Sequence, residues 1–300
     1  MYDIIIVGAG TAGLSAAIYS LRAGKNILLI ESNTYGGQII TSPEVDNYPG
    51  IKHISGFAFA QNLYEQVADL GGKIIYEKVI GIKVNDNDKC VITDKKEYSC
   101  KSIILATGAK KRPLGLEREK ELIGAGVSYC ATCDGAFFKG KDVAVVGGGN
   151  TALEDVGFLA GYCNKVYLIH RRDSFRGEEK LVDKLHQKTN VEIILNSQVE
   201  KIIGEKKVEG IILKNRVDQT SNELKVNGLF IAIGQMPEND AFANVIELDK
   251  SGYIKASEDC KTNIAGVFTA GDCRTKTIRQ LATAAADGAV AALAACEYIA

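Results

Sequence analysis

The stretch Gly8-Ala9-Gly10-Thr11-Ala12-Gly13 decides the fold, and it follows a short apolar run at residues 3–7. A helical pattern over 14–23 comes next, and then a predicted strand at 26–30 that ends at Glu31. This order predicts a Rossmann βαβ unit, in which glycines let the backbone approach a pyrophosphate at the helix N-terminus. A carboxylate about 20 residues after such a loop binds a ribose hydroxyl. We therefore predict a dinucleotide site that includes Gly8, Gly10, Gly13 and Glu31.

The same pattern restarts in the middle of the chain. A second loop, Gly147-Gly148-Gly149-Asn150-Thr151-Ala152, lies between a predicted strand at 141–146 and a predicted helix at 151–160. Where the first repeat has Glu31, this one has His170-Arg171-Arg172, with Arg176 just beyond. A 2′-phosphate prefers bidentate guanidinium partners and would be repelled by a carboxylate. A solvated basic turn is the alternative interpretation, but the matching position favours FAD at the first site and NADPH at the second. The residues predicted for NADPH are Gly147, Gly149, Asn150, Thr151, His170, Arg171, Arg172 and Arg176.

Each βαβ unit is followed by β-rich sequence and closes on a similar strand. The runs of the first repeat predict a small antiparallel insertion; they lie at 73–76, 79–84, 90–93 and 102–105. The chain leaves the first unit near Pro113 and the second near Pro237, where proline stiffens extended linkers. An Ala-rich helix predicted at 279–298 cannot fold alone, so we assign it to the first domain.

These patterns predict an α/β protein with two Rossmann-like dinucleotide-binding domains, each with a parallel sheet and a small β insertion. A discontinuous FAD-binding domain is expected at 1–112 and 240–300, and an NADPH-binding domain at 113–239.

The composition excludes several classes of protein. Lys and Arg number 36 against 37 Asp and Glu, so the formal net charge of −1 does not favour nucleic acid or an anionic membrane as a partner. No apolar run approaches the roughly 18 residues of a membrane span, and the opening segment is too short and too poor in basic residues for a signal peptide. Eight cysteines are too few for a secreted disulfide scaffold. We expect a cytoplasmic protein.

Cys130-Ala131-Thr132-Cys133-Asp134 holds the pair of cysteines that lie close in sequence. A zinc site would need a second ligand pair, and the three histidines are dispersed, so no metal is expected. Two reduced core cysteines remain an alternative. A redox dithiol is favoured, with Asp134 as a local acid–base group for thiolate chemistry, although Asp134 could instead serve only as a turn or helix-capping residue.

Taken together, these motifs resemble the low-molecular-weight, bacterial-type thioredoxin reductases over essentially the whole chain. The placement of the dithiol just before the second glycine loop is the most specific feature, because the larger disulfide reductases carry their cysteine pair in the FAD domain. The resemblance also rests on several shorter motifs: residues 8–13, 36–38, 47–50, 130–135, 147–152, 170–172 with 176, 271–272 and 279–280.

The resemblance implies a homodimer that reduces thioredoxin. Cys133 would meet the flavin, Cys130 would attack the protein substrate, and Asp134 would be the general acid–base. Gln280 and Ala282 would lie near the isoalloxazine. Further contacts to FAD would come from Gly36, Gly37, Gln38, Asn47, Asp272 and Arg279, and Thr107 and Gly108 are predicted at the end of the first unit's closing strand. Cys273 is unusual after Asp272, and we expect it to be a packing residue.

The predicted domain plan has a mechanical consequence. The dithiol and the NADPH loop lie on one domain, yet each must reach the flavin of the other domain. We therefore expect the NADPH domain to rotate about the two crossings between two orientations.

Other functions fit parts of the pattern. The same relay could serve a glutaredoxin-like or peroxidase-linked protein. A flavin-dependent dithiol oxidase would not need the basic cluster at 170–176, and a ferredoxin/NADP-type flavoprotein would lack the cysteine pair. A non-catalytic redox sensor is disfavoured by the intact dithiol.

Overall fold

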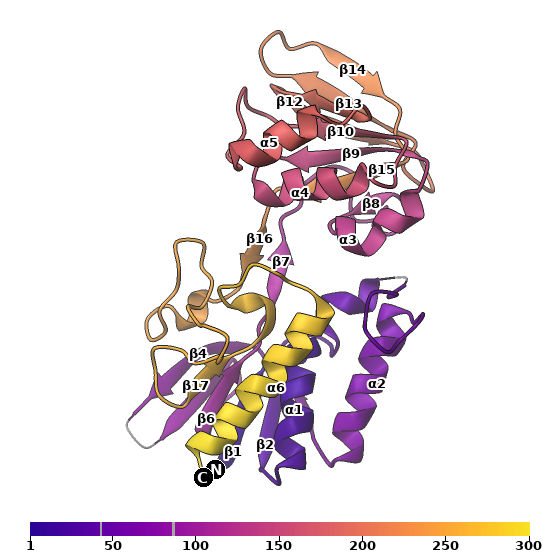
Figure 1. The fold of residues 1–300 in the computed structure, drawn as a ribbon. Coiled ribbons are helices and arrows are strands. Elements are labelled where there is room, and N and C mark those ends of the chain that lie inside the picture. Colours follow the sequence, from indigo (N-terminus) through magenta and orange to yellow (C-terminus); the bar gives the residue numbers. More distant parts are fainter. Residues whose placement is uncertain (43, 86–87) are drawn as a thin grey trace. The chain divides into compact units, whose positions relative to one another are not determined.

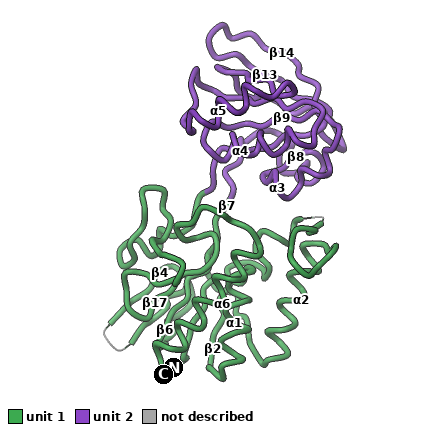
Figure 2. Tube along the Cα trace, viewed as in Figure 1, with its two compact units in different colours: residues 1–110, 236–300 green, residues 111–235 purple. Residues whose placement is uncertain are grey.

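Two crossings of the chain divide it into two units in the computed structural model, which describes residues 1–42, 44–85 and 88–300. Unit 1 comprises Met1–Lys110 and Met236–Ala300, and unit 2 comprises Lys111–Gln235 (Figure 2). The crossings themselves are β7 (Ala109–Lys111) and β16 (Gln235–Pro237), which pair as a two-stranded ribbon.

Unit 1 is built on a seven-stranded sheet (Figure 1). Its parallel part has the order β3-β2-β1-β6, and β17 pairs with the second half of β6. A hairpin of β4 and β5 joins the first half of β6 in antiparallel fashion. The strands are β1 (Tyr2–Val7), β2 (Ile27–Glu31), β3 (Ile74–Tyr76), β4 (Val79–Val84), β5 (Lys89–Thr93), β6 (Glu97–Leu105) and β17 (Val267–Thr269).

The position of β3 differs from the sequence-based expectation. We predicted residues 73–76 in an antiparallel insertion, but Ile74 and Ile75 pair in parallel with Leu29 and Ile30 of β2. The physical reason is that both faces of β3 are covered: Ile74 packs against one core and Ile75 against the other. Contact with a core on both faces is typical of a strand in a parallel sheet.

Alternating side chains of β1 supply the two cores of unit 1. Ile4 and Ile6 enter the core beneath α1 (Thr11–Arg22) and α6 (Leu281–Tyr298), while Ile5 and Val7 enter the core on the opposite face. The two helices pack side by side (Figure 1). The remaining helical segments of unit 1 are α2 (Gly56–Asp69), η1 (Gly37–Thr41), η3 (Asp240–Phe242) and η4 (Gly271–Cys273).

Unit 2 repeats the plan with a five-stranded parallel sheet of order β11-β10-β9-β15-β8. A separate antiparallel sheet, β12-β13-β14, is the insertion that the sequence predicts here. The strands are β8 (Val127–Ser128), β9 (Asp142–Gly147), β10 (Lys165–Ile169), β11 (Val191–Ile194), β12 (Ser197–Ile203), β13 (Gly210–Asn215), β14 (Ser221–Leu224) and β15 (Gly228–Ala232). The helices are α3 (Ala131–Asp134), η2 (Gly135–Phe138), α4 (Asn150–Leu159) and α5 (Glu179–His186).

The described part of the chain holds no helix that is long and apolar enough to cross a membrane. Among the same residues, no group of three or more His, Cys, Asp or Glu side chains gathers in the manner of a metal site.

Candidate functional site

The first glycine loop joins β1 to α1, and its three glycines are needed for two different reasons. A Cβ on Gly8, whose φ is +101°, would lie 2.3 Å from the carbonyl oxygen of Ala106. A Cβ on Gly13 would lie 1.8 Å from the carbonyl oxygen of Gly8. Gly10 differs, because beyond the adjoining residues of the chain the nearest described atom to its would-be Cβ is the Cα of Gly37, at 3.9 Å. Packing therefore requires Gly8 and Gly13, whereas Gly10 leaves the open side of the loop clear for a ligand.

Two further segments adjoin this loop. Glu31, at the end of β2, accepts a hydrogen bond at 2.8 Å from the backbone N–H of Ala9, which fixes the carboxylate beside the loop. The backbone N–H of Gly36 donates to the carbonyl oxygen of Ala9 at 2.7 Å. Gly36 and Gly37 both have positive φ, which brings their backbone against the loop without side chains. The structure thus gathers the glycine loop, Glu31 and the 36–37 turn.

The other residues predicted for FAD lie around these segments of unit 1. Gln38 donates from Nε2 to the carbonyl oxygen of Ala109, and Asn47 donates from Nδ2 to Oε1 of Gln280 at 3.4 Å. Gln280 is the N-cap residue of α6 and forms a capping box with Thr283. The remaining predicted residues are placed as follows: Thr107 and Gly108 in the segment between β6 and β7, Asp272 in η4, Arg279 just before α6 and Ala282 in its first turn.

These residues fit FAD by their position and by the groups they offer it. The loop at Gly10 is free of side chains, and α1 starts directly behind it at Thr11. A helix N-terminus of this kind favours a pyrophosphate, and the fixed Glu31 suits a ribose hydroxyl. The fit therefore rests on the open face of Gly10 and the position of Glu31.

In unit 2 the second loop joins β9 to α4. A Cβ on Gly147 would lie 2.5 Å from the carbonyl oxygen of Ala232, so packing requires this glycine. Apart from the adjoining residues of the chain, no described atom lies within 4 Å of a would-be Cβ on Gly149, the N-cap residue of α4. Asn150 exchanges two hydrogen bonds with Glu178, at 2.8 and 3.0 Å. Thr151 is exposed in the first turn of the helix.

The structure separates His170 from its three basic neighbours. The imidazole is 5% exposed and packs beneath the loop, since a Cβ on Gly148 would lie 2.1 Å from its Cε1. It stacks on Phe175 with 5.3 Å between ring centroids. Burial, with the nearby charges of Arg176 and Arg172, lowers the pKa of His170, so the ring is neutral at pH 7. His170 is therefore a support for the loop, and it does not share the exposed position of the arginines.

Arg171, Arg172 and Arg176 are exposed beside the loop. The backbone N–H of Arg176 donates to the carbonyl oxygen of Gly148 at 2.8 Å, which ties the basic segment to the glycine loop. Guanidinium groups next to an open helix N-terminus suit a dinucleotide with a 2′-phosphate. The residues of unit 2 thus fit NADPH.

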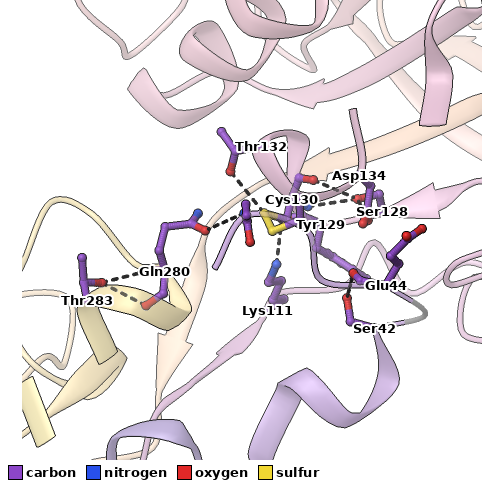
Figure 3. The surroundings of a disulfide bond; sticks show 12 residues. Ser42, Glu44, Lys111, Ser128, Tyr129, Cys130, Thr132, Asp134, Gln280 and Thr283 are labelled. Atoms are coloured by element: carbon purple, nitrogen blue, oxygen red, sulfur yellow. Dashed lines mark hydrogen bonds between the residues drawn. A yellow bond between two sulfur atoms is a disulfide. The ribbon is translucent and has the colours of Figure 1, made fainter. Parts of the chain in front are cut away.

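Cys130 and Cys133 form a disulfide, with 5.3 Å between their Cα atoms (Figure 3). Cys130 is the N-cap residue of the one-turn helix α3, which contains Cys133 and Asp134. The Oγ1 of Thr132 lies 3.4 Å from the Sγ of Cys130. Asp134 makes no side-chain capping hydrogen bond to the following turn, which leaves its carboxylate to other partners.

Comparisons that cover the whole chain show its family. The model of the pyridine nucleotide-disulphide oxidoreductase family matches residues 2–288. A thioredoxin reductase from Peptoclostridium acidaminophilum is 41% identical over 100% of this chain and 97% of its own length. The crystal structure of thioredoxin reductase from Streptococcus pyogenes matches with a TM-score of 0.95 and 37% identity, covering 99% of this chain and 98% of the other. The chain belongs to the thioredoxin reductase family.

Another solved structure that matches this chain is named for ferredoxin and flavin. A ferredoxin-flavin thioredoxin reductase from Clostridium acetobutylicum matches with a TM-score of 0.53 and 31% identity, covering 99% of this chain and 97% of the other. Thioredoxin reductases as a family depend on FAD and NADPH, in agreement with the two glycine loops.

Sequence reasoning missed Ser128, which is buried at the end of β8. Its Oγ donates to Oδ2 of Asp134 at 2.5 Å and accepts from the backbone N–H of Cys130 at 3.1 Å (Figure 3). One hydroxyl therefore joins the carboxylate to the backbone of the first cysteine. The only sequence signal was its place two residues before Cys130.

A second missed contact holds Tyr129. Its hydroxyl donates to Oε1 of Glu119 at 2.5 Å. The Glu119 carboxylate is 1% exposed and also accepts from three backbone N–H groups, those of residues 114, 115 and 116, at 2.8 to 3.0 Å. Burial and the neighbouring carboxylate raise the pKa of Tyr129. Glu119 thus connects the chain after the first crossing to the residue that precedes Cys130, a link that no local sequence pattern indicates.

Proposed function

We propose that this protein is an NADPH-dependent thioredoxin reductase that passes electrons through FAD and the Cys130–Cys133 disulfide to oxidised thioredoxin. The observation that carries the proposal is the disulfide at α3, on the same unit as a glycine loop flanked by exposed Arg171 and Arg172. The names of the relatives support thioredoxin as the substrate.

We assign the two cofactors to the two domains. The domain at 1–112 and 240–300 would hold FAD through the first glycine loop, Glu31 and the 36–38 turn. The domain at 113–239 would hold NADPH through the second loop and the exposed arginines. FAD, when bound, supplies the two-electron carrier between nicotinamide and disulfide.

The dithiol chemistry follows from the cysteines themselves. Two electrons and two protons convert the Cys130–Cys133 disulfide into two thiols. Asp134, which accepts a hydrogen bond from Ser128, would transfer one of these protons. The Cys130 thiolate then attacks the partner's disulfide, forms a mixed disulfide and releases one partner thiolate. The Cys133 thiolate attacks the Sγ of Cys130, which re-forms the original disulfide and releases the second partner thiolate; the two partner thiolates take up the two protons that the Cys130 and Cys133 thiols have lost.

We further propose that the NADPH domain rotates about β7 and β16, because the dithiol and the NADPH loop must each reach the flavin. An engineered disulfide that locks one orientation should abolish turnover and spare FAD binding. Full activity of the locked enzyme would contradict rotation.

We also propose a cytoplasmic homodimer. The other six cysteines are free, and four of these, Cys100, Cys163, Cys260 and Cys273, are buried, as expected in a reducing compartment. Sedimentation equilibrium of the purified protein tests the dimer, and a monomer at micromolar concentration would contradict it.

Anaerobic NADPH titration of the FAD-loaded protein, followed by addition of oxidised thioredoxin, tests the function. Flavin bleaching by NADPH and reoxidation by thioredoxin are expected. Bleaching without reoxidation by thioredoxin would point to another acceptor, such as a glutaredoxin-like protein. Bleaching by reduced ferredoxin and not by NADPH would place the enzyme with the ferredoxin-dependent relative and overturn the NADPH assignment.

A further inference from the structure

Three charged side chains form a buried cluster between α6 and the segment before it. Asp287 of α6 is 8% exposed, Arg274 is 1% exposed and Lys276 is 6% exposed. Arg274 donates from Nε and Nη2 to the two carboxylate oxygens at 2.9 Å, and Lys276 donates from Nζ to Oδ2 at 2.8 Å. A buried ion cluster contributes little net stability compared with apolar packing. Stability alone therefore does not explain why these three charged side chains are buried together.

The same carboxylate holds the backbone of η4. The N–H of Gly271 donates to Oδ2 of Asp287 at 2.9 Å. Gly271 has a φ of +81°, and a Cβ there would lie 2.8 Å from the Cβ of Ala12. Asp287 therefore fixes the backbone directly before Asp272, a residue that we assign to FAD.

Arg279 links the end of the segment 271–279 back to its beginning. Its Nε donates to the carbonyl oxygen of Asp272 and its Nη2 to that of Arg274, both at 3.3 Å. The guanidinium also lies 4.2 Å from the centre of the Tyr253 ring. Residues 271–279 thus form a closed loop, and the hydrogen bonds to Asp287 anchor the part of it that runs from 271 to 276.

The part of α6 around Asp287 also contacts α1, the helix that follows the first glycine loop. A Cβ on Gly288 would lie 2.2 Å from the carbonyl oxygen of Ala12, so α6 and α1 touch there without a side chain between them. The hydroxyl of Ser15 donates to the carbonyl oxygen of Ala285 at 2.7 Å. Residues 285–288 therefore join both sides of the region assigned to FAD: α1 behind the glycine loop and the loop at 271–279.

We propose that Asp287 is a positioning residue for FAD, which keeps residues 271–279 in register with the first glycine loop without touching the cofactor. The inference rests on the proposed FAD site. A role in stability alone could be filled by apolar side chains of similar volume. Only an acceptor at this position can hold the N–H of Gly271.

The test compares the affinity of apoprotein for FAD with the stability of apoprotein. We expect Asp287→Asn to raise the Kd for FAD by about tenfold or more, because it removes the negative charge and leaves one amide oxygen to accept from Arg274, Lys276 and Gly271, while the amide NH2 faces the donors. FAD fluorescence quenching measures the Kd at a temperature where circular dichroism shows both apoproteins folded, because a stability effect alone leaves that Kd unchanged. Glu258→Gln is the matched control, since Glu258 also contacts Arg274, at 3.4 Å, but is 95% exposed. Its Kd should equal that of the wild type.

A second variant serves if Asp287→Asn does not fold. The triple change Arg274→Met, Lys276→Met and Asp287→Leu replaces the ion cluster by apolar groups, and we expect it to fold while its Kd for FAD stays raised. Wild-type affinity in either folded variant would overturn the positioning role and leave the proposed function intact. Failure of the wild type to bind FAD would overturn the proposed function together with this inference.

Discussion

The hydroxyl of Ser128 donates to the carboxylate of Asp134 at 2.5 Å and also accepts from the backbone N–H of Cys130 at 3.1 Å. The predicted acid–base residue and the first cysteine are therefore held by one buried side chain. This arrangement places Asp134 by a tertiary contact, in addition to its position next to Cys133 in α3.

Removal of the Ser128 hydroxyl should slow the thiol–disulfide steps and leave the rate of flavin reduction by NADPH unchanged. Ser128→Ala leaves Asp134 without this donor, and we expect about a tenfold loss in the rate of thioredoxin reduction, a part of the usual contribution of general acid–base catalysis. Stopped-flow absorbance separates flavin reduction by NADPH, expected to be unchanged, from reoxidation. Ser128→Thr should retain the wild-type rate, and an equal loss in both variants would contradict a role of the hydroxyl.

The contact between Tyr129 and Glu119 should contribute to the free energy of unfolding. Tyr129→Phe removes one hydrogen bond and should lower the free energy of unfolding by about 1 kcal/mol. Glu119→Gln should cost more, because three backbone N–H groups also donate to that carboxylate. Urea unfolding at constant FAD concentration measures both, and a larger loss for Tyr129→Phe than for Glu119→Gln would contradict this order.

The exposed arginines should determine the choice of nucleotide. Arg171→Ala with Arg172→Ala removes the guanidinium partners of the 2′-phosphate, so KM for NADPH should rise by about tenfold or more while KM for NADH stays nearly constant. Steady-state kinetics with both nucleotides measures the change. The control is Arg22→Ala, an exposed arginine at the end of α1. An equal rise in KM for NADH would mean that these arginines do not recognise the 2′-phosphate.

His170 should give the protein an acid-dependent loss of stability. Its pKa is lowered from 6.5 in the folded state, chiefly by burial, so the unfolded state binds the proton more readily. The folded protein is therefore favoured above pH 6.5 and loses stability as the pH falls through that value. His170→Gln removes this titration, and its stability deficit relative to wild type should shrink between pH 7.5 and 5.5 in thermal unfolding. A deficit that grows on acidification would contradict the sign.

Much of the fold could be read from the sequence because the two glycine loops obey local rules. A Cβ on Gly8, Gly13 or Gly147 would lie within 2.5 Å of a backbone carbonyl oxygen, so the fold requires glycine at these positions of the motif. The strand at 74–76 was misplaced because its pairing depends on which faces are covered, and a three-residue strand carries no pattern that reports this. The disposition of His170 likewise depends on packing beneath Gly148.

The supporting contacts of the site could not be predicted. Glu119 meets Tyr129, and Asp287 meets Arg274 and Gly271, through tertiary packing that no motif spacing encodes. The motifs identify residues that are expected to meet cofactor or substrate. The residues that hold them become visible only when the chain is folded.

The most direct test of the electron relay is a count of the electrons that the protein accepts from NADPH under anaerobic conditions. Wild-type protein with FAD bound should accept more electrons than the flavin alone can hold, because the Cys130–Cys133 disulfide accepts two more. Cys133→Ser should accept only the flavin's share and should not reduce thioredoxin. Equal uptake by wild type and Cys133→Ser would contradict the relay.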